Sequence, residues 1–416
     1  MIALETIVQA ARVIEGHILQ TPLIYSPALS ARFDAHIYLK LENLQRTGSF
    51  KIRGAAYKII HGRGHGTISA KGVVAASAGN HAQGVALAAS KAGLAATIVM
   101  PQWASIGKQE ATRKYGGRVL IHGATVEESV AHARQIAAQG LTFIHPFDDA
   151  DIIAGQATIG LEILSALPEV DTVLVPVGGG GLIAGIASAL KTRHPRTRVV
   201  GVEAAACPSG QASLLAGRCV SVATGPSIAD GINVKQLGRV PFEIIRRWVD
   251  DVVTVQEAYI AAAIQILLER KRVLAEGAGA APLAALLNGT VRTHSGEKIV
   301  LLISGGNVDT PLLGRILHQG LLKNGRIMRV RLTLNDKPGT LACLLATIAD
   351  LQANILHIRH DRSVERQAID KTSVELELET RNADHIQEII RALGAADYVM
   401  EPIGCPDPVS SELEKK

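Results

Sequence analysis

The chain is poor in cysteine, aromatic side chains and long apolar runs. Its four cysteines lie far apart among 416 residues and form no Cys-x-x-Cys pair, so we expect free thiols rather than a zinc site or a disulfide framework. Only 3% of residues are aromatic, and the 43 basic residues are scattered, which argues against nucleic acid as a partner. No apolar run approaches the roughly 20 residues that cross a bilayer, so no membrane partner is predicted.

What the chain has instead is a series of short apolar segments that alternate with Ala-rich helical stretches between about residues 70 and 310. The predicted strands are residues 72–78, 95–101, 118–123, 171–177, 198–204 and 298–306. Near-continuous apolar strands separated by helices are typical of parallel sheets covered on both faces. The sequence therefore predicts an α/β fold with its ligand site at the carboxyl ends of the strands.

The pattern changes near residues 323–325. Residues 328–334 and 372–379 alternate apolar and polar side chains, as half-buried antiparallel strands do. With helices expected at 340–351 and 383–393, the order is β-α-β-β-α-β, which predicts a ferredoxin-like domain. We expect a larger domain over 1–323, with a smaller subdomain of approximately 50–150 inserted in it, then a domain over 326–402 and a tail over 403–416.

Four consecutive glycines, residues 178–181, separate a predicted strand from a helix. Only glycines let a loop present several backbone N–H groups in one concavity, and the following helix adds the positive end of its dipole. The spacing matches neither the dinucleotide fingerprint nor the Walker loop. A structural turn needs only one or two glycines, so the run predicts a phosphate-binding loop.

Two more turns and one lysine stand out. In "SAGNHAQG", residues 77–84, backbone N–H groups could hold a carboxylate, although Ser77 and Asn80 are equally suited to cap a helix. Ser304, in "LLISGGN", ends a predicted strand. Lys51 follows Phe50 in "TGSFKIRGA", where the residues alone leave a surface charge, a phosphate clamp or a covalent catalyst open. Together these parts predict a pyridoxal phosphate enzyme.

Motifs along the chain carry a family resemblance. "SFKIRGA", "SAGNHAQGVA", "PVGGGGLIAG", "EGAGAAPLAAL" and "SGGN" occur in this order, and residues 5–320 resemble the threonine dehydratases and serine racemase, of the tryptophan-synthase-β-like fold. The segment that begins "LTLNDKPGTLACLL" resembles an ACT regulatory domain. The resemblance implies a fold type II pyridoxal phosphate enzyme with two open parallel-sheet subdomains, followed by the ferredoxin-like domain.

The resemblance also implies a role for each matching residue. Lys51 would bind pyridoxal 5'-phosphate as a Schiff base beside Phe50, and Asn80 would bond the phenolic oxygen of the ring. Ser304 would face the pyridine nitrogen. The phosphate would be bound by Gly178, Gly179, Gly180, Gly181 and Leu182. The substrate carboxylate would be bound by Ser77, Ala78, Gly79 and His81.

The implied activity is β-elimination and deamination of L-threonine to 2-oxobutanoate and ammonia, in isoleucine biosynthesis or threonine catabolism. A neutral hydroxyl at Ser304 does not keep the pyridine nitrogen protonated, which favours elimination over transamination. Two alternatives stay open. One is a dehydratase of L-serine or of a 3-hydroxy-aspartate-type substrate. The other is a non-catalytic amino-acid sensor, against which the intact motifs count.

Several positions depart from the relatives or keep two interpretations. Ala78 stands where serine racemase has an acid-base serine, so racemisation is not expected. Glu203 matches one metal ligand of those relatives, but Ser209 replaces a second carboxylate, so no metal site is predicted. Glu276 either lies near the ring or caps a helix. His81 is either a base or a positioning residue, and we expect His145 to be structural.

The resemblance implies regulation and assembly. Gly339 lies in the turn where ACT domains bind amino-acid effectors, so an effector such as isoleucine or valine is expected there. ACT domains commonly pair their sheets, which predicts a homo-oligomer, specifically a tetramer. The N-terminal segment, with Glu5 and Glu15, fits an amphipathic helix rather than a secretory signal, so we expect a cytoplasmic protein.

Overall fold

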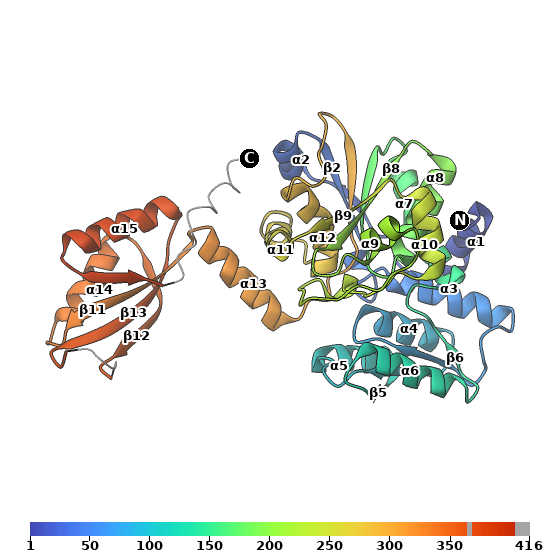
Figure 1. Cartoon of the computed structure of the whole chain (residues 1–416), viewed down its shortest axis with the longest axis horizontal. Coiled ribbons are helices and arrows are strands. Elements are labelled where there is room, and N and C mark those ends of the chain that lie inside the picture. Colours follow the sequence, from blue (N-terminus) through green and yellow to red (C-terminus); the bar gives the residue numbers. More distant parts are fainter. Residues whose placement is uncertain (364–367, 404–416) are drawn as a thin grey trace. The chain divides into compact units, whose positions relative to one another are not determined.

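The computed structural model describes residues 1–363 and 368–403. The chain divides into two compact units, Met1–Asp309 and Thr310–Lys416 (Figure 1). Cys207, Cys219 and Cys343 are free thiols, whereas Cys405 and all of the predicted tail beyond residue 403 lie outside the described residues. The domain bounds expected from the sequence stay predictions.

The larger sheet of the first unit has six strands in the order β1-β2-β10-β7-β8-β9. All neighbours are parallel except β1, which runs antiparallel to β2. The strands are β1 Leu23–Tyr25, β2 His36–Leu41, β7 Thr172–Pro176, β8 Arg198–Ala204, β9 Asp251–Val255 and β10 Lys298–Ile303. Because β10 and β7 are parallel neighbours, the loops that follow them leave the same edge of the sheet.

The smaller sheet is entirely parallel, in the order β5-β4-β3-β6. Its strands are β3 Val73–Ala76, β4 Ala96–Met100, β5 Gly117–Ile121 and β6 Thr142–Phe143. The side chains of β3 are all buried, as expected for a strand covered on both faces. The two parallel sheets confirm the predicted fold class.

Helices cover both sheets (Figure 1). They are α1 Leu4–Ile14, α2 Pro27–Phe33, α3 Lys51–Gly64, α4 Asn80–Lys91, α5 Ile106–Lys114, α6 Val126–Ala137, α7 Ala150–Ala166, α8 Gly181–Arg193, α9 Ser209–Ala216, α10 Arg239–Trp248, α11 Glu257–Lys271 and α12 Gly277–Leu287, with short 3-10 helices η1 Glu42–Leu44 and η2 Asp230–Ile232. Small residues let these helices approach closely: a Cβ on Gly155 of α7 would overlap the backbone of Gly54 in α3. The lysine-bearing helix α3 therefore lies directly against α7.

The second unit is an antiparallel sheet with helices. Its elements are α13 Thr310–Lys323, β11 Ile327–Asn335, α14 Thr340–Asp350, β12 Asn354–Asp361, β13 Lys371–Glu379, α15 Ala383–Ala395 and β14 Val399–Pro402, and the strand order is β12-β13-β11-β14. Val330 lies opposite Leu376 in the core, while Arg331 lies opposite Glu375 on the exposed side. The β-α-β-β-α-β order and the alternation are both confirmed.

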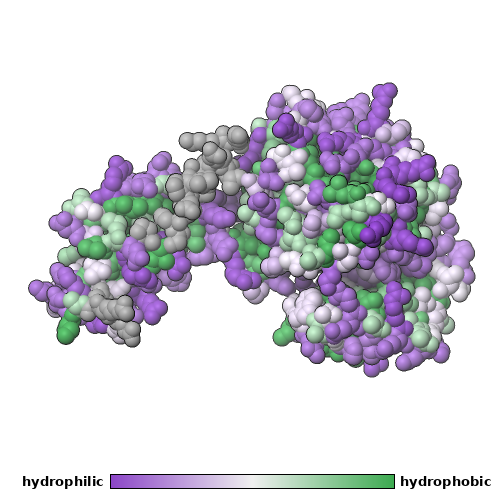
Figure 2. Space-filling model, viewed as in Figure 1, coloured by the Kyte–Doolittle hydropathy of each residue, from purple (hydrophilic) through white to green (hydrophobic). Residues whose placement is uncertain are grey.

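The surface and the core differ in how apolar their side chains are. In Figure 2 apolar side chains appear as separate patches among hydrophilic ones, and the apolar residues of the central strands are buried. Within the described part of the chain, no helix is both long and apolar enough to span a bilayer.

Candidate active site

Lys51 is the first residue of α3, and the end of β10 holds the segment before it. The backbone N–H of Phe50 donates to the carbonyl of Ser304 (3.0 Å), and Ser49 forms an antiparallel bridge with Gly305. The structure therefore brings Lys51, Phe50 and Ser304 together, although some 250 residues of chain separate them.

The Lys51 side chain points at the segment that precedes α7. Its Nζ donates to the carbonyl of Pro146 (3.1 Å) and lies 5.1 Å from the centre of the Phe50 ring. Burial lowers the pKa of Lys51 to about 8, while the Glu276 carboxylate opposes this shift. A buried amine with a lowered pKa is neutral more often at physiological pH, and a neutral amine is a nucleophile and a base.

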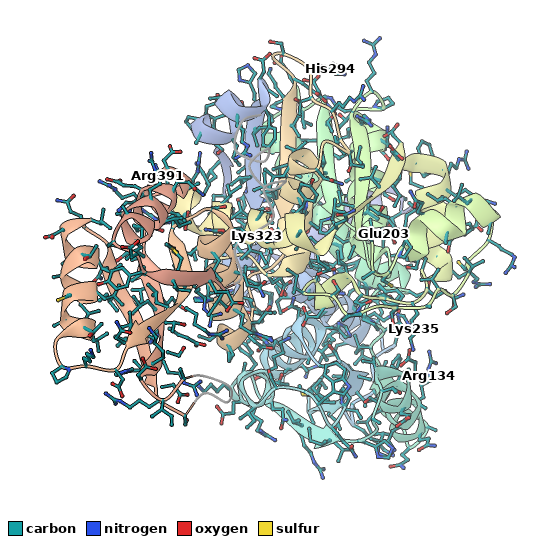
Figure 3. The ribbon with its side chains drawn as sticks, turned by 60° about the vertical axis from the view of Figure 1, so that its left-hand side comes forward. Arg134, Glu203, Lys235, His294, Lys323 and Arg391 are labelled. Atoms are coloured by element: carbon teal, nitrogen blue, oxygen red, sulfur yellow. The ribbon has the colours of Figure 1, made fainter. Side chains whose placement is uncertain are left out.

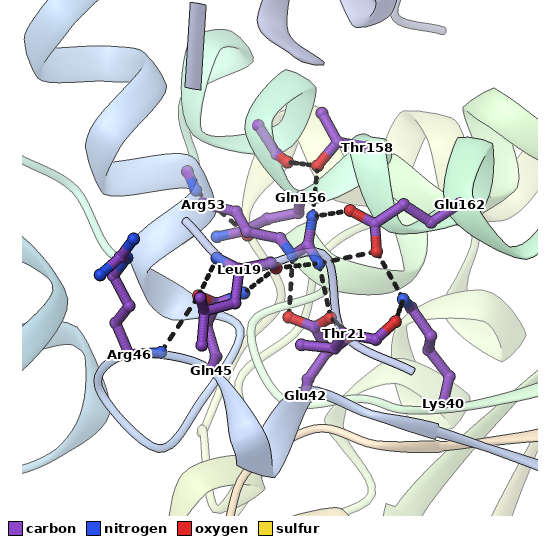
Figure 4. Close-up of polar contacts among 12 residues, drawn as sticks. Leu19, Thr21, Lys40, Glu42, Gln45, Arg46, Arg53, Gln156, Thr158 and Glu162 are labelled. Carbon is purple, nitrogen blue, oxygen red and sulfur yellow. Dashed lines mark hydrogen bonds and ion pairs between the residues drawn. The ribbon is translucent and has the colours of Figure 1, made fainter. Parts of the chain in front are cut away.

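A buried ion network anchors the first turn of α3 (Figure 4). The Arg53 guanidinium, two residues after Lys51, makes two hydrogen bonds to Glu42 (2.8 and 2.7 Å) and bonds Glu162 at 2.6 Å. Lys40 pairs with the same Glu162, so two cations balance two anions. Bidentate arginine pairs fix geometry as well as charge, and here they fix the position of the lysine-bearing turn.

Asn80 connects three parts of the first unit. Its Nδ2 donates to Glu276 Oε1 (2.7 Å), and its Oδ1 accepts from Asn307 Nδ2 (2.7 Å). Glu276 occupies the N-cap position of α12, but its side chain makes no capping hydrogen bond. The structure thus favours the interpretation that places Glu276 in the site, and sequence reasoning missed Asn307, whose only signal was its place in "SGGN".

The Glu276 carboxyl group is buried beside Lys51. Burial, and secondarily the carboxylate of Asp230, raise the pKa of Glu276 to about 7, while Asn80, Lys108 and Lys51 lower it. Perturbed groups of opposite sign in one buried place are typical of functional sites. Glu276 can therefore change its charge near neutral pH.

The tetraglycine loop leads directly into α8. None of the hydrogen bonds found among the described residues uses a backbone N–H of residues 178–181, although these glycines are buried. Gly180 has a φ of +87°, which favours glycine. Consecutive unpaired N–H groups at a helix N-terminus form an anion-binding site. Leu182, the next residue, is buried in α8.

The loop also has a packing reason for its glycines, which sequence reasoning missed. A Cβ on Gly179 would overlap the Phe147 ring, and one on Gly181 would lie 2.9 Å from the Phe147 carbonyl. Phe147 follows Pro146, the acceptor for Lys51. His145 holds this turn, since its Nδ1 accepts from the N–H of Asp148 (2.8 Å). Lys51 and the glycine loop thus contact the same turn.

The predicted carboxylate loop follows β3. Ser77 Oγ accepts from the N–H of Gly79 (3.1 Å), and Gly79, not Ser77 or Asn80, is the N-cap residue of α4. Ala78 is half-buried against the core. His81 is buried, and its Nε2 donates to the Ile144 carbonyl (3.0 Å). Burial lowers the pKa of His81 to about 3, which favours the positioning interpretation over a base.

Glu203 and Ser209, which were compared with metal ligands of the relatives, bond to backbone groups at the start of α9 and at Val234. Figure 3 shows Glu203 among the strands of the larger sheet. Its two carboxylate oxygens accept from the N–H groups of Gly210 (2.6 Å) and Gln211 (2.9 Å), at the start of α9. Ser209 Oγ donates to the Val234 carbonyl (2.8 Å). In the described residues Glu203 therefore caps α9.

Comparison with known families shows to which family this chain belongs. Residues 14–305 match the family described as "Pyridoxal-phosphate dependent enzyme". The chain belongs to this family. Residues 323–401 match the ACT domain, so this pyridoxal-phosphate dependent enzyme carries an ACT domain after its catalytic part. Both resemblances drawn from the sequence motifs are confirmed.

Individual relatives of the enzyme agree. The chain is 47% identical over 409 residues to an L-threonine ammonia-lyase of Thermotoga maritima, in an alignment that covers 97% of this chain and 100% of the relative. Among solved structures it is similar to a threonine deaminase of T.th. (40% identity, TM-score 0.69, 74% of this chain and 99% of that chain). Maize serine racemase is similar too (34% identity, TM-score 0.71, 76% and 97%).

The site fits the cofactor of its family. The N–H groups of residues 178–181 have no acceptor among the described residues, which suits a phosphate. The Lys51 amine, with its lowered pKa, suits an aldehyde. Ser304 is buried directly after β10, and a serine hydroxyl at this position can donate a hydrogen bond to a ring nitrogen.

Proposed function

We propose that this enzyme is a threonine ammonia-lyase, which converts L-threonine to 2-oxobutanoate and ammonia at Lys51. The observation that carries the proposal is the 47% identity to an L-threonine ammonia-lyase over 97% of the chain, an alignment that includes both the catalytic part and the ACT domain. The two-domain composition further supports a regulated reaction, in isoleucine biosynthesis or in threonine catabolism.

Each predicted cofactor residue has a proposed task. Lys51 would bind pyridoxal phosphate covalently, with Phe50 beside the ring and Asn80 on the phenolic oxygen. Ser304 would face the ring nitrogen. The phosphate would be bound by Gly178, Gly179, Gly180, Gly181 and Leu182. When bound, the cofactor stabilises negative charge that develops at the α-carbon of the substrate.

The remaining tasks fall to side chains and backbone groups of this chain. The Lys51 Nζ would remove the α-proton, because a neutral amine can accept it and the lowered pKa keeps part of the lysine neutral. The loop that includes Ser77, Ala78 and Gly79 would orient the substrate carboxylate at the N-terminus of α4. His81 would position this loop through its bond to Ile144.

Two features limit which reaction and which class of substrate we propose. Ala78 has no proton to give on the face opposite Lys51, which counts against racemisation despite the similarity to a serine racemase. Lys108, the lysine that pairs with Asp230 near Glu276, is already neutralised by that aspartate (2.7 Å). It therefore offers little attraction to a second substrate carboxylate, which supports a neutral amino acid over a 3-hydroxy-aspartate-type substrate.

The ACT domain would bind the effector. A cavity of about 350 Å³ lies at the turn before α14, where Gly339 has a φ of +90°. Its polar lining includes Asn335, Asp336, Lys337, Thr340, His360 and Arg362. His360 Nε2 is buried without a partner in the described part of the chain. Charges of both signs and an unpaired ring nitrogen suit the ammonium and carboxylate groups of an amino acid.

The remaining proposals concern the domain bounds, the oligomeric state and the location of the protein. We propose a catalytic domain over 1–323, with a smaller subdomain of approximately 50–150, and a regulatory domain over 326–402. We also propose a homo-oligomer, specifically a tetramer, located in the cytoplasm. Light scattering that shows a monomer at micromolar concentration would contradict the oligomer.

The proposed activity is tested by supplying L-threonine, L-serine and 3-hydroxy-aspartate to the purified enzyme and measuring each 2-oxo acid and ammonia. We expect L-threonine to have the highest kcat/KM. Lys108 is already paired with Asp230, which disfavours an acidic substrate, and the relative aligned over 97% of the chain is named an L-threonine ammonia-lyase. L-threonine ranking last would refute the assignment.

A further inference from the structure

Lys108, on the smaller-sheet side of the catalytic unit, makes ion pairs with the larger-sheet side. Lys108 lies in the first turn of α5, its side chain is only 15% exposed, and its Nζ lies 2.7 Å from Asp230 Oδ2 and 3.7 Å from Asp309 Oδ2. Ser105, the N-cap residue of α5, makes no cap; its hydroxyl donates to Asp309 Oδ1 (3.1 Å). Serine at this position ordinarily caps its own helix. Here the polar groups of Ser105 and Lys108, at the start of α5, bond to the two aspartates instead.

The Asp230 side of this contact adjoins the site. Asp230 opens η2, and a Cβ on the next residue, Gly231, would lie 3.6 Å from Glu276 Oε1. A Cβ on Gly178 would lie 3.0 Å from the Cα of Ile232. The segment that receives Lys108 therefore packs against both Glu276 and the first glycine of the phosphate loop.

The Asp309 side adjoins the site as well. Asp309 stands two residues after Asn307, whose Nδ2 donates to Asn80 Oδ1 and to the carbonyl of Thr47. A displacement of Asp309 would pull on the hydrogen bonds that hold Asn80. Lys108 thus reaches both borders of the Lys51 site from a helix that belongs to the smaller sheet.

Electrostatics keep this contact charged. Burial alone would lower the pKa of Lys108, but Asp230, and after it Asp309, raise it above the ordinary value. The two aspartate side chains are 59% and 42% exposed, so water screens the pair. A screened pair that stays charged can break and re-form without a large barrier.

We propose that Lys108 is a positioning residue whose paired contacts with Asp230 and Asp309 latch α5 onto the larger-sheet side and hold the Lys51 site closed during turnover. The kinetic part of this proposal rests on the proposed lyase function. The latch itself is a property of the catalytic unit and can be measured without turnover.

The test compares the full-length, cofactor-loaded enzyme with its Lys108→Met variant. Amide hydrogen exchange in peptides over residues 101–116 should become about 2- to 5-fold faster, the range that a screened ion pair allows. The KM for L-threonine should rise by about the same factor while kcat changes by less than about twofold. Lys108→Arg, which keeps the charge, should restore both values.

Lys298→Met is the matched control, because Lys298 pairs with the exposed Glu169 on the surface and should leave exchange and KM unchanged. Asp230→Asn is a second route to the same opening if Lys108→Met folds poorly. Unchanged exchange and unchanged KM in both latch variants would overturn the proposal. A wild-type enzyme that does not deaminate L-threonine would instead refute the proposed function and leave the exchange comparison valid.

Discussion

At the scale of single residues, Lys51 and Glu276 form the electrostatic centre of the site. Burial disfavours the charge on both, which brings the pKa of Lys51 down to about 8 and that of Glu276 up to about 7. Each group favours the charged form of the other. The protonation of the pair is therefore sensitive to pH between about 7 and 8.

This pairing predicts how the cofactor-free protein takes up pyridoxal phosphate. Uptake should become faster as pH rises through about 8, because only the neutral Lys51 amine attacks an aldehyde. Glu276→Gln removes the carboxylate that raises the pKa of Lys51, so the midpoint should move to lower pH. The rate of the absorbance change on mixing, measured over a pH series, gives both midpoints. Glu169→Gln, at an exposed pair, is the control, and a Glu276→Gln midpoint that stays or rises would contradict the account.

Sequence motifs identified candidate site residues better than they identified the contacts that these residues make with distant segments of the chain. Lys51, Asn80 and Ser304 were found because each stands in a recognisable motif at a strand end or helix start, and their roles stay predictions. Phe147 and Lys108 were not found as site residues. Their significance comes from the tetraglycine loop and from Asp230, segments distant in the sequence, and no local pattern encodes such a contact.

At the scale of elements, the tetraglycine loop has two physical requirements. Its unpaired N–H groups suit a phosphate, and its missing side chains let Phe147 pack against it. Gly180 meets a further neighbour, since a Cβ there would lie 2.8 Å from Ile245 in α10. The sequence argument gave only the first reason, so it understated why all four positions exclude a side chain.

Gly179→Ala should therefore weaken both folding and cofactor binding. The added Cβ would overlap the Phe147 ring, and overpacking of this kind costs about 1–3 kcal/mol of unfolding free energy. Denaturant unfolding and a cofactor titration measure the two effects. Gly64→Ala, where a Cβ meets no atom within 4 Å, should change neither. A Gly179→Ala variant that matches wild type in both measurements would contradict the packing argument.

Several elements with long patterns were predicted from the sequence. The buried strands β7, β8 and β10 and the alternating strands β11 and β13 were found from the sequence, because each carries at least five residues of pattern. The strands β2 and β9, with six and five residues, were missed although they are as long. The strands β1 and β6, with three and two residues, were missed as well. Such short strands carry too little pattern, and pairing with β2 or β3 defines them.

At the scale of the whole molecule, a catalytic unit and an ACT domain in one chain predict regulation by an amino acid. Isoleucine or valine should shift the L-threonine saturation curve of the full chain, and a chain that ends at residue 325 should keep turnover but not respond. Arg362→Ala, which removes the ion pair to Asp336 in the ACT cavity (2.8 Å), should weaken the response. Arg391→Ala, on the exposed side of α15 (Figure 3), should not. A response that survives truncation would show that the effector binds elsewhere.

The central claim is that this enzyme deaminates L-threonine and that Lys51 performs the reaction. The most direct measurement is 2-oxobutanoate formed from L-threonine by the full-length wild type and by Lys51→Ala, with circular dichroism to show that both are folded. We predict 2-oxobutanoate and ammonia in equal amounts from the wild type, and a loss of at least about a hundredfold in the folded variant. No 2-oxobutanoate from the wild type, or a Lys51→Ala variant that retains the wild-type rate, would contradict the account.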